Sequence, residues 1–180
     1  MNFSKDTKAY VMLILCTAFW SGNFIVGKVA TLFEIPPLTL NFYRWFIAWI
    51  ILAPFTLKEV VANWSVIKEN FLSLMIMAFT SISVFNSVVY YALNYTQVLN
   101  GVLMISTIPV LIIFISSIFK TERTNVFQVL GVVVSLCGVV IIITKMEFQR
   151  LIHLQLNKGD LWMLVAMFSW ATYSIMMKEK

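Results

Sequence analysis

The sequence predicts an all-α integral membrane protein with six transmembrane helices, on the evidence of its composition and of long intervals without charge. Of the 180 residues, 61% are apolar and only 12% are charged, whereas an ordinary soluble domain has about 45–50% and about 25%. The chain therefore has far more hydrocarbon than one small core can bury. This composition excludes disorder and a typical cytosolic enzyme, and it requires the lipid bilayer as a partner.

The charged and reactive residues indicate no other partner. Most of the 13 Lys and Arg residues, which give a net charge of +5, stand at the ends of apolar stretches, where the positive-inside rule places them. Cys16 and Cys137 lie inside apolar runs without metal-ligand spacing, and His153 is the only histidine. We therefore expect no nucleic-acid partner, no bound metal and no cofactor.

Intervals without charge mark the first two spans, because a helix needs about 20 apolar residues to cross the bilayer. Residues 9–27 form the first interval, and no small-residue cleavage site follows its apolar run, so we expect an uncleaved helix. Pro36 and Pro37 favour the start of a second helix. This helix is expected over residues 38–57, with Arg44 as its one charge.

The next charge-free interval, residues 70–119, is too long for one span. A single helix of this length would be about 75 Å long, more than twice the thickness of the hydrocarbon core. We therefore expect a hairpin, with its turn at the polar residues 94–97, Asn100 and Gly101. The remaining elements are a fifth span over 125–144, a hydrophilic loop over 145–158 and a sixth span over 161–177.

The distribution of basic residues favours a cytoplasmic N-terminus, and we expect the protein to lie in the plasma (inner) membrane. With that orientation the outer loops carry only Lys145, Arg150 and Lys158, and Lys28 and Arg44 lie near outer helix ends. The positive-inside rule favours the side with more basic residues as the inner one. The basic residues on the inner side are Lys5, Lys8, Lys58, Lys68, Lys120, Arg123, Lys178 and Lys180.

A weak internal repeat begins at the sixth span. The pair Trp20 and Lys28 recurs as Trp170 and Lys178, with the same spacing, 150 residues further along. Because five spans precede it, the second copy would enter the membrane in the opposite direction, as in inverted-repeat transporters. We therefore expect the chain to be a fragment, or a truncated gene product, of a protein of about 300 residues.

Several short segments follow the order and spacing of one known family. They are FWSGNFIVGK at 19–28, PPLTLNFYRWFIA at 36–48 and YYALNYT at 90–96, followed by Pro109, Glu122-Arg123, Gly131 and Gly138. Through this series, residues 9–144 resemble one unit of the EamA family of the drug/metabolite transporter superfamily. Thr121 stands where the family usually has a glycine.

The resemblance implies a ten-helix transporter of two inverted five-helix repeats (5+5), with both termini in the cytoplasm, that moves small metabolites or amino acids. It makes 1–145 the first five-helix repeat, 146–158 a loop and 159–180 the first helix of a truncated second repeat. The partner of this chain is then a missing C-terminal half or, in a homodimer, a second copy. The alternative is a truncated membrane fragment that transports nothing.

Polar side chains inside the first two spans are candidates for substrate binding, because a polar group in lipid needs a partner or a water-filled cavity. Trp20 and Asn23 share one face of the first helix, where they line a cavity or join two helices. Arg44 costs about 2.5–3.5 kcal/mol at the bilayer centre. It either binds a substrate carboxylate or holds Glu34 or loop carbonyls.

A polar stripe marks the third span. Ser83, Asn86, Tyr90 and Asn94 fall on one face at α-helical spacing, and they line a cavity or bond to neighbouring helices. Pro109 lies near the middle of the fourth span, where it should bend the helix. The candidate substrate-binding residues are Trp20, Asn23, Arg44, Ser83, Asn86 and Tyr90.

The sequence lacks the residues that other membrane functions need. No Asp or Glu lies inside a predicted span, so this part of the chain offers no carboxylate to carry protons. No serine-hydrolase, zinc-protease or phosphate-loop motif occurs. The leading hypothesis is therefore a secondary carrier working by alternating access, and not an enzyme.

Overall fold

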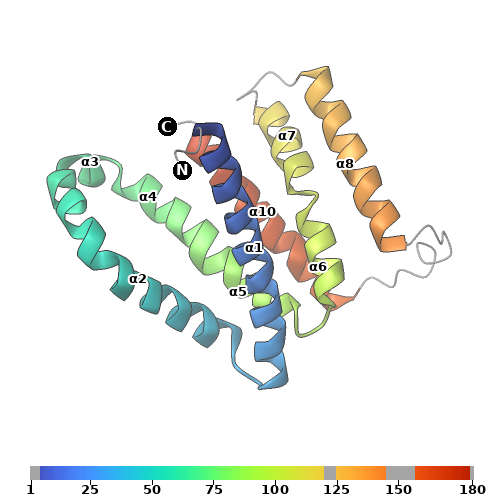
Figure 1. Ribbon diagram of the computed structural model, residues 1–180, viewed down its shortest axis with the longest axis horizontal. Coiled ribbons are helices and arrows are strands. Elements are labelled where there is room, and N and C mark those ends of the chain that lie inside the picture. The colour runs from blue at the N-terminus through green and yellow to red at the C-terminus, as the bar shows by residue number, and fades with distance from the viewer. Residues whose placement is uncertain (1–4, 120–124, 145–156, 179–180) are drawn as a thin grey trace.

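The computed structural model describes residues 5–119, 125–144 and 157–178, which are almost entirely helical. Figure 1 shows α1 near the middle, α2 leaning away from it towards α3, and α8 on the other side of the molecule. Residues 145–156 of the predicted loop lie outside the described residues, as does Glu122-Arg123. The elements are α1 (Lys5–Leu32), α2 (Pro37–Ala62), α3 (Trp64–Glu69), α4 (Phe71–Ala78), the π-helical segment η1 (Phe79–Val84), α5 (Phe85–Ala92), α6 (Val98–Ile105), α7 (Ile108–Phe119), α8 (Val126–Thr144) and α10 (Lys158–Lys178).

Four stretches of the described chain are long and apolar enough to cross a membrane: Asp6–Leu32, Pro37–Ala62, Phe71–Ala92 and Val98–Ile118. They coincide with the first four predicted spans, so the all-helical membrane class is confirmed. The apolar part of α8, Val126–Gly138, is shorter, and α10 has 21 residues without reaching the same hydropathy. The count of six spans and the ten-helix arrangement stay predictions.

The helices run beyond the charge-free intervals. Helix α1 already begins at Lys5 and continues past Lys28 to Leu32, because a lysine at a span end keeps its helical backbone while its amine reaches a polar region. The turn that follows contains Glu34 with a φ of 55°. Pro37 then occupies the first position of α2, where its missing N–H costs no hydrogen bond.

The fourth span is broken as Pro109 predicts. Helix α6 ends at Ile105 and α7 begins at Ile108, since proline cannot donate to the preceding turn. At the break the hydroxyls of Ser106 and Thr107 each donate to a carbonyl of α6, at 2.6 Å. These bonds partly compensate for the backbone hydrogen bonds that are missing at the break.

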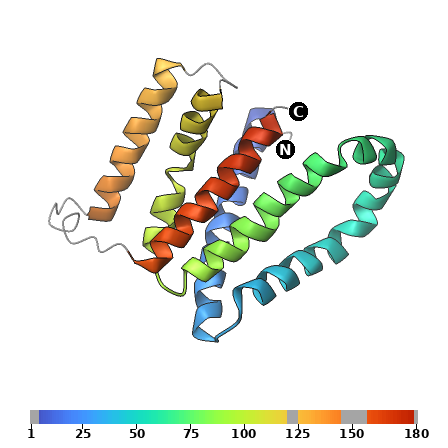
Figure 2. The same cartoon turned by 180° about the vertical axis from the view of Figure 1, so that it is seen from behind.

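The buried core lies where α5 meets α10. It contains Val89, Tyr90, Ala92, Leu93, Met163 and Ala166. Figure 2 shows α10 crossing in front, between α4–α5 and α6–α7, with α1 behind it. Gly159 makes the closest part of this contact possible, because a Cβ there would lie 2.6 Å from the carbonyl oxygen of Ala92.

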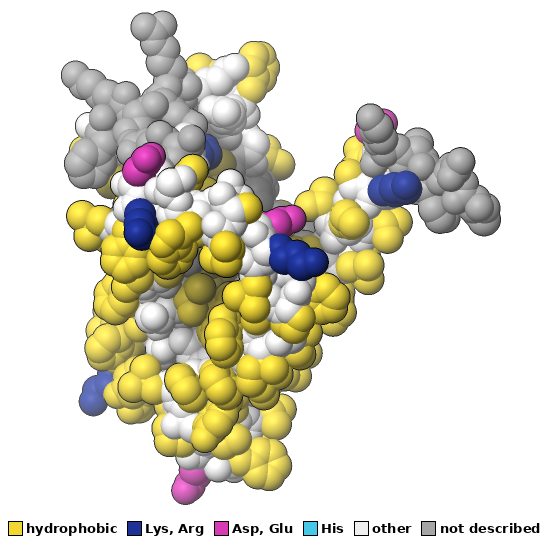
Figure 3. Space-filling view, turned by 90° about the vertical axis from the view of Figure 1, so that its left-hand side faces the viewer, with side chains coloured by type: hydrophobic (Ala, Val, Ile, Leu, Met, Phe, Trp, Pro, Cys, Tyr) yellow, Lys and Arg dark blue, Asp and Glu magenta, His cyan; other side chains and the backbone are white. Residues whose placement is uncertain are grey.

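Apolar side chains cover the flanks of the molecule. In Figure 3 they form a broad band, with charged side chains mainly above and below it. The most apolar 18-residue windows of α1 and α2 contain no buried residue, and Phe19 and Phe55 are both 78% exposed. Large exposed apolar surfaces of this kind meet lipid or further protein.

Candidate functional site

Four of the six predicted site residues meet at Arg44, a half-buried guanidinium on α2. Its Nη1 donates hydrogen bonds to Asn23 Oδ1 of α1 and to the Tyr90 hydroxyl of α5. Its Nη2 donates to Asn86 Oδ1, also of α5, at 2.8 Å. The Tyr90 hydroxyl donates to Asn23 Oδ1. These four residues, here called the Arg44 cluster, join three helices.

Each helix brings its member of the cluster to a similar depth. Arg44 is seven residues after the start of α2 and Asn86 six residues before the end of α5, which places both about 10 Å from the same end of the bundle. Asn23 is nine residues before the end of α1, or about 14 Å. The cluster therefore lies inside the apolar spans, where polar groups need one another.

The partners of Arg44 differ from the structural alternative that the sequence offered. Among the described residues, Arg44 bonds neither to Glu34 nor to a loop carbonyl, and three of its five donors go to Asn23, Asn86 and Tyr90 of the neighbouring helices. Two aromatic rings also lie near the guanidinium: its Cζ is 5.4 Å from the ring centroid of Trp45 and 5.5 Å from that of Tyr90. Such rings stabilise a cation without neutralising it.

Asn86 connects the Arg44 cluster to the π-helical segment η1. Its Nδ2 donates to the carbonyl oxygens of Ser81 at 2.9 Å and Ile82 at 3.3 Å. From α10, the Ser169 hydroxyl donates to the carbonyl oxygen of Thr80 at 2.7 Å. Side chains thus bond to three successive carbonyls of η1. π-Helical turns inside α-helices are frequent at functional sites.

A second polar pair, Asn41 and Ser87, lies beside the cluster and was missed by the sequence analysis. Asn41 is 6% exposed and Ser87 8%. The Asn41 Nδ2 donates to Ser87 Oγ at 2.9 Å and to the Ile82 carbonyl at 3.0 Å, while its Oδ1 has no hydrogen-bond partner in the described chain. The position of Asn41, three residues before Arg44 on one helical face, is the signal that points to it.

Replacing Asn41 by alanine is expected to lower the free energy of unfolding by about 1–3 kcal/mol, because buried hydrogen-bonding groups lose a partner. The measurement is the thermal unfolding midpoint of the purified protein. The control is Thr172→Ala, since the Thr172 hydroxyl is exposed and donates to the carbonyl oxygen of Phe168 in its own helix. Equal midpoints for the two variants would show that the buried amide contributes nothing to stability.

The remaining predicted residues, Trp20 and Ser83, lie outside the Arg44 cluster. The Trp20 ring packs edge to face against Trp170 of α10, with centroids 5.7 Å apart. Ser83 is an exposed residue of η1, whereas Asn86 is buried. The wider π-helical turn changes the angular spacing along the helix. The predicted polar stripe is therefore interrupted between Ser83 and Asn86.

Polar contacts close the end of the bundle nearest to the cluster. Lys28 Nζ donates to the carbonyl oxygens of Leu93 at 2.6 Å and Thr96 at 3.1 Å, just after α5, where the helix dipole favours a cation. The Thr96 hydroxyl donates to Asp160 Oδ1 of α10 at 2.9 Å. Three helices, α1, α5 and α10, are thus tied together through Thr96.

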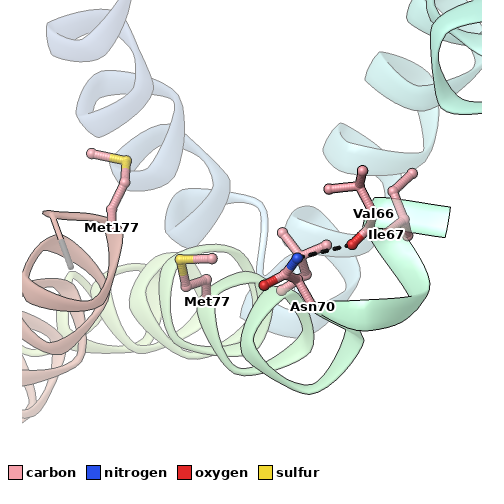
Figure 4. Close-up of a pocket in the computed structure, with 6 residues that line it drawn as sticks. Val66, Ile67, Asn70, Met77 and Met177 are labelled. Carbon is pink, nitrogen blue, oxygen red and sulfur yellow. Dashed lines mark hydrogen bonds between the residues drawn. The ribbon is translucent and has the colours of Figure 1, made fainter. Parts of the chain in front are cut away.

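An open groove of about 540 Å³ lies at the opposite end, between α3–α4 and the end of α10. Figure 4 shows Met77 and Met177 on different helices of its wall, and the Asn70 amide bonded to the carbonyl oxygen of Val66 at 3.0 Å. Its lining contains no charged side chain. Within the described ranges, no three His, Cys, Asp or Glu residues gather as a metal site requires. The groove lining is Val66, Ile67, Asn70, Leu74, Met77 and Met177.

Several known proteins are similar to this chain. An uncharacterized transporter of Archaeoglobus fulgidus is 29% identical over 176 residues, covering 95% of this chain and 57% of that protein. The uncharacterized transporters YyaM and YoaV of Bacillus subtilis are 24% and 26% identical, over 56% and 57% of their own lengths and 96% and 95% of this chain. The chain therefore spans little more than half the length of these relatives. No solved structure matches it significantly.

The family follows from a separate match over most of the chain. Residues 7–144 match the EamA-like transporter family. This range runs from the first turn of α1 to the end of α8 and contains every member of the Arg44 cluster. The helices, the apolar surface and the polar cluster are those of a multi-pass membrane protein. The chain belongs to the EamA-like transporter family.

Proposed function

We propose that this chain is part of a secondary carrier that moves small polar metabolites, amino acids among them, by alternating access. The observation that carries the proposal is the Arg44 cluster, a cation with three neutral polar partners from apolar helices. An ionisable residue inside a membrane span is by default a functional-site candidate. In this proposal Asn23, Arg44, Asn86 and Tyr90 bind substrate, and Trp20 adds an aromatic wall towards α10.

The proposal includes an inverted repeat in which α1 and α10 are equivalent helices. They run in opposite directions, so the start of α1 and the end of α10 lie close together in Figure 1. Trp20 and Trp170, which the sequence pairs across the repeat, contact each other. A contact between equivalent residues is expected where they lie beside the two-fold axis that relates inverted repeats. The remaining helices would belong to the rest of the longer protein.

The two ends of the bundle fit one state of an alternating-access cycle. The Lys28–Thr96–Asp160 contacts close the end near the cluster, while the groove beside Met77 and Met177 is open at the other end. We propose that the N-terminus lies in the cytoplasm, as the basic residues favour. In that orientation the closed end lies on the outer side of the plasma membrane.

The test is transport of radiolabelled amino acids into everted membrane vesicles that contain the full-length protein. Asn86→Ala and Tyr90→Phe are expected to reduce transport, because each removes a bond to the Arg44 guanidinium. Hydrogen bonds to charged groups contribute about 1.5–3 kcal/mol, so the loss should be about 10- to 100-fold. The amount of protein in the membrane, measured by immunoblot, should not change.

Two neighbours on the same segment of chain serve as matched controls. Tyr91→Phe removes a hydroxyl whose partner is the exposed Tyr95 hydroxyl. Asn94→Ala removes an amide that, within the described residues, bonds only to carbonyls one turn back. Both should transport as the unchanged protein does. Full transport by Asn86→Ala and Tyr90→Phe would contradict the assignment of the site.

A further inference from the structure

We propose that the Arg44 cluster selects substrates that carry a carboxylate, which binds to the side of the guanidinium that the protein leaves open. The inference rests on the proposed function, since it names the substrate class of the same site. It is carried by two independent properties of the cluster, its charge and its balance of hydrogen-bond donors and acceptors.

The charge of Arg44 is not neutralised in the described chain. All its hydrogen-bond partners, Asn23, Asn86 and Tyr90, are neutral side chains. No Asp or Glu of the described ranges lies among them, and the aromatic rings beside the guanidinium leave its charge in place. A lone cation within an apolar span is costly, so an anion that neutralises it is bound favourably.

The guanidinium keeps donors for such an anion. It has five N–H groups, and within the described residues three are used, two on Nη1 and one on Nη2. The Nε–H and the second Nη2–H remain. A carboxylate accepts two parallel N–H bonds from a guanidinium, so the donors that remain equal the number required.

The rest of the cluster also presents donors rather than acceptors. Because a guanidinium only donates, the amide oxygens of Asn23 and Asn86 must face Arg44. The Tyr90 hydroxyl gives its proton to Asn23 Oδ1, and the Asn86 Nδ2 is used by η1. The Asn23 Nδ2 has no acceptor among the described residues, so it adds donors next to Arg44. An ionised carboxylate, which only accepts, complements this set, whereas an ammonium group does not.

The experiment compares two isosteric pairs of probes that differ in charge, benzoate with benzamide and acetate with acetamide. The readout is the thermal unfolding midpoint, Tm, of the purified full-length protein. Ligands that bind the folded state raise Tm, and we expect a saturable rise of about 2–4 °C with at least one carboxylate and none with its amide. Arg44→Gln should lose the rise, and Arg44→Lys should retain a smaller one because lysine lacks the planar fork.

A second variant keeps the test valid if Arg44→Gln does not fold. Asn23→Asp places a carboxylate next to the guanidinium at Nη1, so we expect it to neutralise Arg44 and to abolish the effect of benzoate and acetate. Asn94→Asp, on the exposed end of the same polar stripe, should leave the effect intact. A carboxylate effect that persists in Asn23→Asp would overturn the inference.

Three further results of the Tm and transport measurements would each support or overturn the inference. No rise with either carboxylate in the unchanged protein would overturn the inference. Equal transport of phenylalanine and phenylalaninamide in vesicles would overturn it while leaving the carrier proposal standing. Carboxylate binding that depends on Arg44, without transport of any amino acid, would support the anion site and contradict the carrier.

Discussion

Gly27→Ala is expected to lower the free energy of unfolding by about 1–3 kcal/mol, the range for overpacked cores. A Cβ at this position of α1 would lie 2.7 Å from Tyr90 Cδ1 and 3.0 Å from Leu93 Cδ1. Neither neighbour can move easily, since both are buried and the Tyr90 hydroxyl is bonded to Asn23 and Arg44. The substitution should therefore push α1 off α5 and weaken the Arg44 cluster. Thermal unfolding and vesicle transport measure the two effects.

Gly22, on the same helix, is the matched control. A Cβ there meets nothing within 4 Å, and alanine favours a helix over glycine by about 0.8–1.0 kcal/mol. Gly22→Ala should therefore leave transport unchanged and keep or slightly raise the unfolding midpoint. If Gly27→Ala behaves in the same way, α1 does not pack on α5 as described.

Asp160→Ala should also destabilise the protein strongly. The Asp160 carboxylate is 5% exposed. It accepts hydrogen bonds from the Thr96 hydroxyl and from the backbone N–H of Asn157, both at 2.9 Å, while the Asn157 side chain accepts the Asp160 N–H. This reciprocal pair is a capping box. Loss of the cap should lower the free energy of unfolding by about 0.5–2 kcal/mol. The buried Thr96 hydroxyl, left without an acceptor, should lower it by about 1–3 kcal/mol more.

Asp160→Asn should lower the free energy of unfolding by less, because one side-chain oxygen remains to accept a hydrogen bond from Thr96 or Asn157. Asp6→Ala is the control, since Asp6 also stands in the first turn of a helix but is exposed. The thermal unfolding midpoint ranks the three variants. A midpoint for Asp160→Ala equal to that of Asp6→Ala would refute the role of the cap in joining α10 to α5.

The class and the first four spans followed from the sequence because lipid imposes a simple rule on length and charge. The helix ends did not, since Lys5, Lys28 and Lys58 are parts of helices rather than breaks between them. The segment η1 was also unpredictable. It contains no glycine or proline, and side chains from three helices bond to its carbonyls.

For the candidate site, spacing along each helix identified the faces but not their partners. Asn23, Arg44, Asn86 and Tyr90 were each visible as polar residues in apolar spans. Asn23 and Arg44 meet Asn86 and Tyr90 because of the way α1 and α2 pack against α5. No local sequence pattern encodes this packing. Asn41 was not predicted, because a neutral amide near the start of a helix is common. Its importance becomes visible only through its hydrogen bond to the buried Ser87.

The bonds of Arg44 also have a consequence for the order in which the chain is made. Proteins are synthesised from the N-terminus, so Asn23 precedes Arg44, whereas Asn86 and Tyr90 follow it by 42 and 46 residues. Helix α2 must therefore enter the bilayer with its cation only partly satisfied. Its aromatic and aliphatic residues hold it there until α5 arrives, which couples the insertion of an early helix to the synthesis of a later one.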